Sequence, residues 1–386
     1  MSGVTATYTV EIAWTSPVFG GFIVGTSKVG DTIGYFTVTG WVDETERVLN
    51  MKINRGSTDD LGKVINGSCT IVLKDTNGRF NPTNTASALY PNVNPMRPVR
   101  VKATYGATDY YRFFGYVQSI TENPSPSKRS VSIRCTDLIS WLSTEYPVVA
   151  ANGTATTTGT AIERILDTIG FTDASFRDLD TGDTIADYSA DGTQSALTQI
   201  QNLVAAEGGT FYISRAGAAT FENRYARNQA PRTSDQSTLS GTMLDLTAMS
   251  DVIQIINSTK YTRTGGTAQT FTDDTSRQRY GKRIKPMSSS FWVNDAQALS
   301  AGTFFVGMKK NPAQPVRVSI SGNVSAALMV VLLARDISDR LGISESRGGT
   351  TGSFYIESIS ETIETGKFHS AELYCSMRPA SFPTNY

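Results

Sequence analysis

The sequence predicts a mainly β protein (α+β overall), with two similar β-barrel domains and a small α/β domain between them. The chain has 386 residues, which is more than a single hydrophobic core usually serves. Only 18% of the residues are charged and 33 are glycine, a composition that favours strands and tight turns over long surface helices. In addition, one strand–turn–strand pattern occurs twice, towards opposite ends of the chain.

The repeated pattern is a predicted β-hairpin. Its first limb, Tyr116–Glu122, returns as Tyr355–Glu361 after an offset of 239 residues (355 − 116), with identical or closely related residues at all seven positions. The second limbs, Ser130–Cys135 and Ser370–Cys375, alternate apolar with polar side chains. This alternation is the period of a half-buried strand. We interpret the two segments as copies of one hairpin, each closing its own β domain.

Residues 41–147 are predicted to form the first barrel. Gly67–Leu73 places apolar side chains on one strand face, and Asn77-Gly78 follows as a tight turn. Pro82 cannot donate to a strand ladder and ends the pairing. Five or six short strands in about 100 residues indicate a closed or nearly closed barrel. Residues 1–40, rich in glycine and threonine, are expected to be irregular strands or an arm.

A small α/β middle domain is predicted for residues 148–240. Residues 266–311 are assigned to the same domain. Thr160 is a candidate N-cap for a helix with apolar residues at helical spacing. A second helix is expected from Gln194 to Ala206, ended by two glycines.

The second barrel is predicted from residues 241–265 and 312–386. The tetrapeptide Pro315–Val318 has the same sequence as Pro98–Val101. Pro98–Val101 precedes the first hairpin, and Pro315–Val318 precedes the second hairpin. The longer gap before the second hairpin contains the apolar run Ala326–Ala334, which we expect to be helical. The repeat is therefore interpreted as a barrel with an insertion.

Few residues match a catalytic or metal-binding pattern. His369 is the single histidine, and we predict that it lies at the surface. The cysteines Cys69, Cys135 and Cys375 lie in separate strand-like segments, so they are interpreted as buried small hydrophobes and provide no zinc ligand set. A Ser–His–Asp triad would need His369, and no Gly-x-Ser-x-Gly motif accompanies it. We expect no catalytic residue, no cofactor and no metal.

Charged segments receive structural interpretations. Paired carboxylates on different strands could in principle cleave glycosides, but Glu122 and Glu361 occupy equivalent positions of the repeat. Duplicated acids indicate a shared geometric role more than a catalytic pair. We interpret the basic cluster Arg277–Arg283 as a solvated or subunit-facing loop. The acidic segment Asp178–Asp183 is interpreted as a solvated loop.

The overall balance of charge and hydropathy argues against recruitment by nucleic acid or membranes. Lys+Arg and Asp+Glu both number 35, so the chain carries no net field for phosphates or anionic lipids. The apolar run Ala326–Ala334 is far shorter than the ~20 residues that span a bilayer. We expect a soluble protein, made and folded inside a cell.

The order of several soft motifs resembles the tail-tip or baseplate hub proteins of tailed bacteriophages. Together the matching motifs cover most of residues 41–378. In the first domain they are Arg55-Gly56, Asn77–Pro82, Leu89–Asn92, Arg97–Val101, Phe114–Val117 and Cys135–Asp137; further along they are Glu207–Phe211 and Asp336–Arg340.

The resemblance implies a homotrimeric structural virion protein without catalysis. Each subunit would give two similar tube domains to a pseudo-sixfold ring, which would dock on the hexameric tail tube or distal tail protein and continue its channel for DNA. Other tail-tip or fibre proteins would be partners. The chain would reside in the phage tail tip, and in the host cytoplasm before assembly, without inserting into a membrane. Because the chain ends shortly after the second hairpin, a peptidase or lysozyme activity is expected from another protein.

Neutral or acidic side chains would line such a channel best, because Lys and Arg bind phosphates. Our candidate lumen-facing residues are Gln118, Glu122, Glu357 and Glu361. Two alternatives stay open. The chain could be a carbohydrate-binding or cell-wall-degrading β protein of the tail tip, or a hexameric tail adaptor, which the internal repeat disfavours because a hexamer needs only one barrel per chain.

Overall fold

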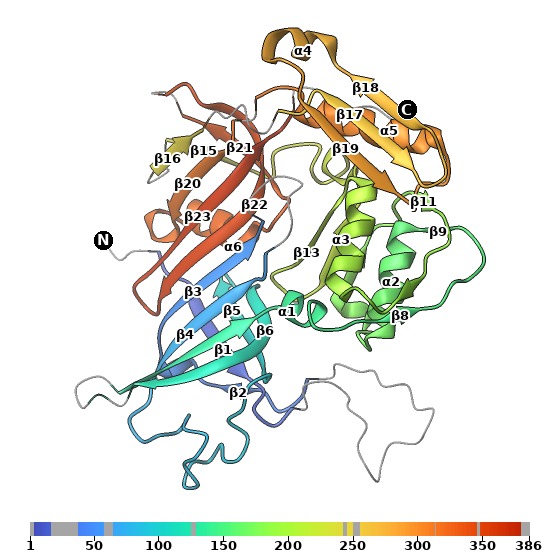
Figure 1. The fold of residues 1–386 in the computed structure, drawn as a ribbon. Helices are drawn as coiled ribbons and strands as arrows, with labels where there is room; N and C mark the ends of the chain where they lie inside the picture. The colour runs from blue at the N-terminus through green and yellow to red at the C-terminus, as the bar shows by residue number, and fades with distance from the viewer. Residues whose placement is uncertain are drawn as a thin grey trace.

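A large antiparallel sheet dominates the structure, and a helical layer and smaller sheets lie to one side of it (Figure 1). The computed structural model describes residues 4–16, 38–57, 65–123, 125, 129–241, 245–249, 255–312, 314–345 and 348–379. The protein is mainly β, as predicted. None of the described helices has the length and apolar character needed to cross a membrane.

The first half of the large sheet has the order β3-β4-β7-β6-β5-β1-β2, with every pair antiparallel. Its strands are β1 (Thr7–Ile12), β2 (Val42–Asp43), β3 (Val48–Gly56), β4 (Ser68–Lys74), β5 (Pro98–Tyr105), β6 (Thr108–Asn123) and β7 (Ser130–Thr136). A 3-10 turn, η1 (Thr45–Arg47), leads into β3. Alternate residues such as Ile71 and Ile133 are fully buried on one face, as the apolar alternation predicts.

Strand β1 refines the prediction of irregular strands or an arm for residues 1–40, because Thr7–Ile12 is a regular strand of the large sheet. It pairs with β5 along its whole length, and Val10, Ile12 and Trp14 are fully buried. The alternation of Tyr8, Val10 and Ile12 was the available signal, but the glycine-rich composition of residues 1–40 obscured it. Residues 17–37 lie outside the described part of the chain.

The second half of the sheet has the order β16-β20-β23-β22, and β21 pairs with both β22 and β15. Its strands are β15 (Ser237–Ser240), β16 (Asp245–Ala248), β20 (Val316–Ser321), β21 (Arg340–Ser344), β22 (Thr351–Glu364) and β23 (Phe368–Met377). The turn η4 (Gly322–Val324) and helix α6 (Ala326–Ala334) connect β20 to β21. The apolar run of α6 is therefore helical, as predicted, and Leu328, Met329 and Leu333 are buried against the sheet.

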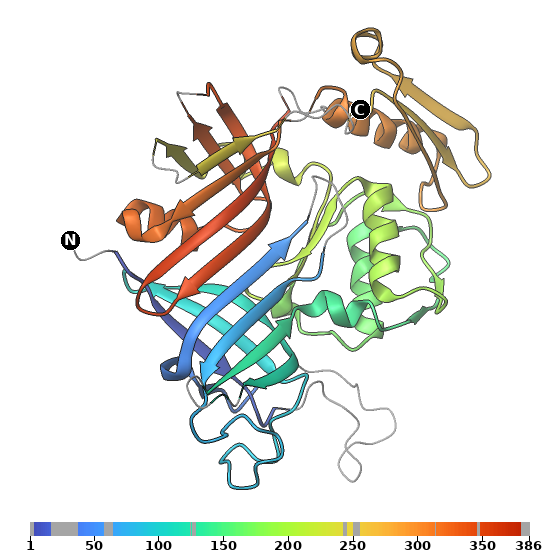
Figure 2. The ribbon, with the colours of Figure 1, turned by 60° about the vertical axis from the view of Figure 1, so that its left-hand side comes forward.

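The two halves are one continuous sheet, because β22 pairs with β3 (Figure 2). Ser358–Glu364 lies antiparallel to Asn50–Gly56, and we call this junction the internal seam. A single hydrophobic cluster extends through both halves. The 13 strands form an open sheet, and no sheet among the described residues closes on itself, in contrast to the two separate barrels that the sequence predicts.

The hairpin repeat is confirmed in the strand pairing. In the first copy Val117 lies opposite Cys135, a bulge follows, and Ile120 lies opposite Ile133. In the second copy Ile356 lies opposite Cys375, a bulge follows, and Ile359 lies opposite Leu373. The bulge residues, Gln118 and Glu357, are thus equivalent, as their offset of 239 predicts.

The repeated tetrapeptide is a coincidence, and the structure corrects that prediction. Pro98–Val101 lies in β5, which pairs with the first limb of its hairpin. Pro315–Val318 leads into β20, which pairs with the second limb. The equivalent of β20 is therefore β4, since Cys69 faces Cys135 as Val316 faces Cys375, and the equivalent of β5 is β21.

The middle region packs helices over small sheets. Its helices are α1 (Leu138–Leu142), α2 (Thr158–Thr168) and α3 (Ala196–Glu207), with short turns η2 (Ala174–Phe176) and η3 (Ala226–Asn228). Helices α2 and α3 lie close to the predicted positions. Thr157, not Thr160, caps α2, by accepting a hydrogen bond from the Thr160 N–H at 3.3 Å. The strands are β8 (Val148–Val149), β9 (Thr156–Thr157), β10 (Arg177–Leu179), β11 (Thr184–Ile185), β12 (Ala190–Asp191), β13 (Thr210–Ile213) and β14 (Ala219–Glu222).

A further unit carries its own three-stranded sheet, β18-β17-β19. It contains β17 (Ser258–Arg263), β18 (Ala268–Thr272), α4 (Asp274–Tyr280), β19 (Ile284–Ser289) and α5 (Asp295–Lys309), which packs against β17 and β18. Asn294 caps α5, by accepting a hydrogen bond from the Gln297 N–H at 2.9 Å. Strand β17 was predicted to join the second barrel, but it pairs only within this unit in the described part of the chain. Most of the basic cluster Arg277–Arg283 lies on α4, not in a loop.

Candidate assembly surface

The internal seam depends on a glycine. Gly56 has φ +112°, a conformation that L side chains rarely adopt. A Cβ atom at this position would lie 2.1 Å from the carbonyl oxygen of Glu357. The neighbouring Ser57 N–H donates to that same oxygen at 2.8 Å. Glycine therefore allows the end of β3 to approach the bulge of β22 closely enough to extend the ladder.

A buried ionic network lies beside the seam. The Arg112 guanidinium donates to both carboxylate oxygens of Glu361, at 2.6 and 3.1 Å, and to the carbonyl of Leu333 at 2.6 Å. His369 Nε2 lies 2.9 Å from Glu361, and the Tyr8 hydroxyl lies 2.6 Å from His369 Nδ1. The network joins strands of both halves, β1 and β6 with β22 and β23. Burial opposes ionisation of Glu361, but Arg112 and His369 together hold its pKa well below the usual range.

A second buried pair joins the bulge of β22 to the middle region. Arg227 on η3 donates to both oxygens of Glu357, at 2.6 and 2.9 Å. Ser376 on β23 also donates to Glu357. Nearby, Arg55 donates to Asp336 at 2.6 Å. The carboxylates at this junction therefore form ion pairs that join elements distant in sequence.

These contacts correct two of the four predicted lumen residues. Glu357 and Glu361 are only 2% and 1% exposed, so neither carboxylate can line a water-filled channel. Glu122 and Gln118 are exposed, and their place in a channel stays a prediction. Glu122 lies opposite the buried Val131, so it shares the core side of the sheet at the open end of the hairpin.

His369 is also corrected, because the structure buries it to 1% exposure instead of placing it at the surface. In the neutral state its Nε2–H can donate to Glu361 while Nδ1 accepts from Tyr8. His369 lies near the start of β23, opposite Ile363 of β22, so the register of this hairpin fixes its position. The three cysteines are free and buried, as predicted.

The titration of His369 predicts a pH dependence of stability. Burial lowers the pKa of His369 below its usual value, and Glu361 opposes this only in part. The unfolded chain therefore takes up a proton near pH 6.5 that the folded protein accepts only at lower pH. We expect the free energy of unfolding to fall, relative to a His369→Gln variant, as the pH drops below 6.5. The loss can reach about 1.4 kcal/mol for each pH unit until the folded pKa is passed. Urea unfolding of both proteins between pH 5 and 7.5 measures it; a constant difference would contradict the prediction.

The face of the sheet opposite the core is lined mainly by small polar side chains. They alternate with the buried residues along the strands on both sides of the seam. The members include Asn54, Thr70, Ser132, Ser319, Ser358, Ser360, Thr362 and Ser370, with Lys52, Arg134, Arg317 and Glu372 as charged members. Sequence reasoning missed this face, although the polar positions of the predicted strands already marked it.

The two halves differ in one respect that concerns assembly. Beyond its bulge, β22 is paired on both sides, by β23 and by β3. Beyond its own bulge, β6 pairs with β7 only. In the described part of the chain, the other edge of Ser119–Asn123 has no partner strand, and neither does the outer edge of β16.

Backbone contacts just before these edges are equivalent in the two halves. The Met96 N–H donates to Val117, whose own N–H donates to Arg97; the Ser338 N–H donates to Ile356, whose own N–H donates to Asp339. Met96 and Ser338 both have positive φ, at 64° and 69°. The same local backbone structure therefore lies just before the open edge of β6 and just before the paired edge of β22.

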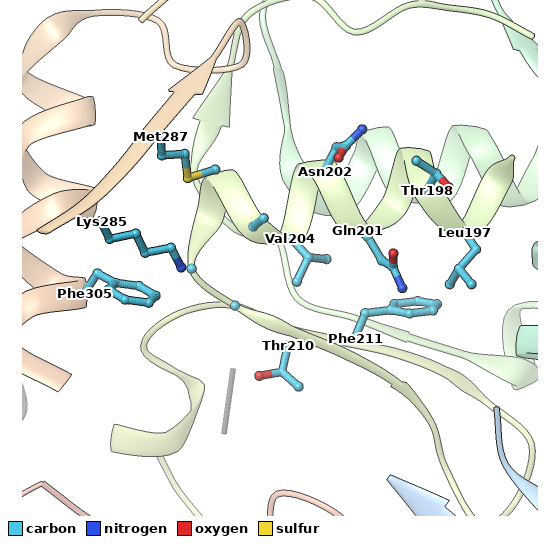
Figure 3. A pocket seen from close by; sticks show the side chains of 13 residues that line it. Leu197, Thr198, Gln201, Asn202, Val204, Thr210, Phe211, Lys285, Met287 and Phe305 are labelled. Carbon is cyan, nitrogen blue, oxygen red and sulfur yellow. The ribbon is translucent and has the colours of Figure 1, made fainter. Parts of the chain in front are cut away.

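A groove lies between α3 and the β19–α5 unit (Figure 3). Its volume is about 260 Å³, and apolar side chains such as Val204, Phe211, Met287 and Phe305 line it beside Lys285. None of its thirteen lining residues is Asp, Glu, His or Cys. The groove therefore lacks the paired carboxylates that glycoside hydrolysis uses. The described residues also contain no group of three potential metal ligands.

Three solved structures with the same fold are tail proteins. A tail protein from Neisseria meningitidis superposes with a TM-score of 0.63 at 9% identity, covering 99% of this chain and 100% of that one. The chain has the fold of phage tail proteins. The 43 kDa tail protein of prophage MuSo2 from Shewanella oneidensis gives a TM-score of 0.56 at 10% identity, covering 97% of each chain. The prophage tail protein gp18 from Listeria monocytogenes gives 0.51 at 12% identity, covering 90% of this chain and 94% of that one.

This tail-protein fold is not evident from sequence similarity. No protein-family model matches the chain, and no curated protein matches its sequence. The resemblance that we drew from the order of motifs is nevertheless confirmed at the level of the fold.

Proposed function

We propose that this chain is the hub of a phage tail tip: a structural virion protein that forms a trimer and adapts the hexameric tail tube to threefold symmetry. Each half of the large sheet acts as one tube domain, and in the assembled ring the halves complete barrel-like domains. The ring continues the channel of the tail tube or distal tail protein, and other tail-tip or fibre proteins attach around it. The chain would reside in the virion, after synthesis in the host cytoplasm.

One observation carries the proposal. The chain holds two structurally equivalent half-sheets, and the slot that β3 fills beside β22 is open beside β6. Three chains with two half-sheets each would give six similar units, which suits contact with a hexameric tube. The fold shared with tail proteins supports the same role.

In this proposal the polar face of the sheet lines the channel. Hydroxyl side chains such as those of Thr70 and Ser132, and the amide of Asn54, hydrate the wall without fixed charge, so DNA phosphates find few cations to bind. Lys52, Arg134 and Arg317 are exposed basic residues of the wall, and Arg317 is paired with Glu372. Glu122 and Gln118 were predicted for this role, and the polar face now takes their place as the main candidate lining.

The oligomeric state tests the proposal. We expect a solution mass of about three times 41.7 kDa, measured by light scattering on the full chain, and a ring with six similar lobes in negative-stain images. A chain that stays monomeric at high concentration, both alone and with the tail tube protein, would overturn the hub role.

We also infer that the chain acts without catalysis, and we expect no cofactor. The carboxylates of the repeat support this, because Glu357 and Glu361 are bound by arginines inside the protein. The alternative, a carbohydrate-binding or cell-wall-degrading protein, is tested by incubating the purified chain with peptidoglycan. Release of soluble fragments would favour that alternative.

A further inference from the structure

We propose which strand edges join neighbouring copies and in what register: β16 of one copy pairs antiparallel with the open edge of β6 in the next. Thr121 then lies opposite Met249, Glu122 opposite Ala248, and Asn123 opposite Thr247 of the neighbouring copy. This inference rests on the proposed ring, and it specifies the contact that forms it.

The filled slot at the internal seam is the template. Before the bulge at Glu357, one edge of β22 pairs with β21. After the bulge the same edge pairs with β3, with Glu361 opposite Ile53 and Thr362 opposite Lys52. In the first half, the pairing of β5 with β6 ends at the equivalent point, before the bulge at Gln118. By the offset of 239, Glu122 on β6 occupies the place of Glu361.

Strand β16 is the equivalent of β3. Both strands lie antiparallel beside equivalent neighbours, β3 beside β4 and β16 beside β20. Ile53 lies opposite Cys69, and Ala248 lies opposite Val316. Since Cys69 and Val316 are equivalent, Ala248 takes the place of Ile53, and therefore faces Glu122.

The backbone of β16 is oriented for this contact. The Met249 N–H donates towards β20, to the carbonyl of Pro315 at 3.0 Å. Alternate residues of a strand direct their backbone groups to opposite edges, so Ala248 presents its N–H and C=O to the open edge. Thr247, Ala248 and Met249 are all exposed in the single chain, and pairing would cover them.

The contact also gives Glu122 a role different from the one first predicted. At the internal seam, Glu361 is held by His369 from the adjacent limb of the hairpin. By the offset of 240 that relates the second limbs, the position of His369 is taken by Arg129 in the first hairpin, and Arg129 is exposed. We therefore expect a Glu122–Arg129 pair to be covered when β16 docks, which makes Glu122 a residue of the subunit contact and not of the channel wall.

The contact joins different surfaces of two identical chains, so it is head to tail. Such a contact closes a ring when the rotation between copies divides a full turn, and otherwise builds a filament. The internal seam and the new contact would alternate around the ring, and both would be antiparallel ladders between equivalent strands. Three copies have six junctions, so they close the ring if each junction turns the sheet by about one sixth of a full turn.

Cysteine cross-linking tests the register. A variant with Thr121→Cys and Met249→Cys places two thiols at a pair that does not exchange backbone hydrogen bonds, where Cα atoms in antiparallel strands lie about 4.5 Å apart, within disulfide range. Both positions are exposed in the single chain, and the native cysteines are buried. After mild oxidation we expect non-reducing gels to show dimers and closed trimers and little monomer.

A matched control shifts the register by one residue. The Thr121→Cys, Ala248→Cys variant directs the two thiols to opposite faces, and we expect less than a tenth of the cross-linking. Two proteins with one introduced cysteine each, Thr121→Cys and Met249→Cys, mixed in equal amounts, should form only the mixed dimer, and each can be checked for folding separately.

The outcomes separate the inference from the proposed function. A trimer by mass that cross-links in register supports both. A trimer whose control pair cross-links as well as the in-register pair, or whose in-register pair does not cross-link, overturns the register and leaves the ring intact. A monomer at every concentration that also fails to cross-link overturns both.

Discussion

Replacing Arg112 by methionine is expected to lower the free energy of unfolding by about 3–5 kcal/mol, the cost of leaving one member of a buried ion pair without its partner. Arg112 is fully buried and holds both oxygens of Glu361 as well as the carbonyl of Leu333. The substitution leaves a buried carboxylate with His369 as its remaining neighbour. Equilibrium urea unfolding, followed by tryptophan fluorescence, measures the loss.

Two comparisons separate the buried charge from lost packing. Arg317 pairs with Glu372 at 2.9 Å on the surface, with side chains 54% and 48% exposed. Arg317→Met removes the same chemical group there, and we expect a loss below about 1 kcal/mol. The double variant Arg112→Met, Glu361→Leu should recover much of the loss, because no charge is then left buried. Equal losses at Arg112 and Arg317 would contradict this account.

The sequence allowed local structure to be predicted where the pattern is short-ranged. The alternation in the hairpins and the helical spacing before the glycines near Gly208 depend on neighbouring residues, and both predictions hold. The offset of 239 even places the two bulges, because equivalent hairpins share a register. The tail-protein fold followed from the order of such segments.

Contacts between distant segments could not be predicted in this way. Glu361 looked like a channel residue because its partner Arg112 lies 249 positions away, and no local pattern indicates that the two side chains meet. The tetrapeptide at Pro315 led to a wrong assignment of equivalent strands for the same reason, since the pairing of a strand depends on contacts across the whole sheet. The polar face was visible in the strands, but only pairing shows that it is continuous across the seam.

Gly56→Ala is the second substitution for which we expect a large effect, a loss of about 3 kcal/mol or more in the free energy of unfolding. A non-glycine residue in a sparsely populated backbone region costs about 1–3 kcal/mol by itself. In addition, the new Cβ would lie 2.1 Å from the carbonyl oxygen of Glu357, so the ladder between β3 and β22 must open locally. Because that ladder joins the two halves, we also expect faster proteolysis at the seam, measured by limited digestion followed by mass spectrometry.

Gly106→Ala is the matched control for the backbone cost alone. Gly106 also has positive φ, at 58°, but a Cβ there meets nothing within 4 Å. We expect a loss of about 1 kcal/mol, the ordinary cost of a left-handed L residue, with unchanged proteolysis at the seam. Equal losses at the two glycines would mean that the close approach of β3 to the Glu357 bulge contributes little, and that the halves are held together mainly by the shared core and the buried arginines.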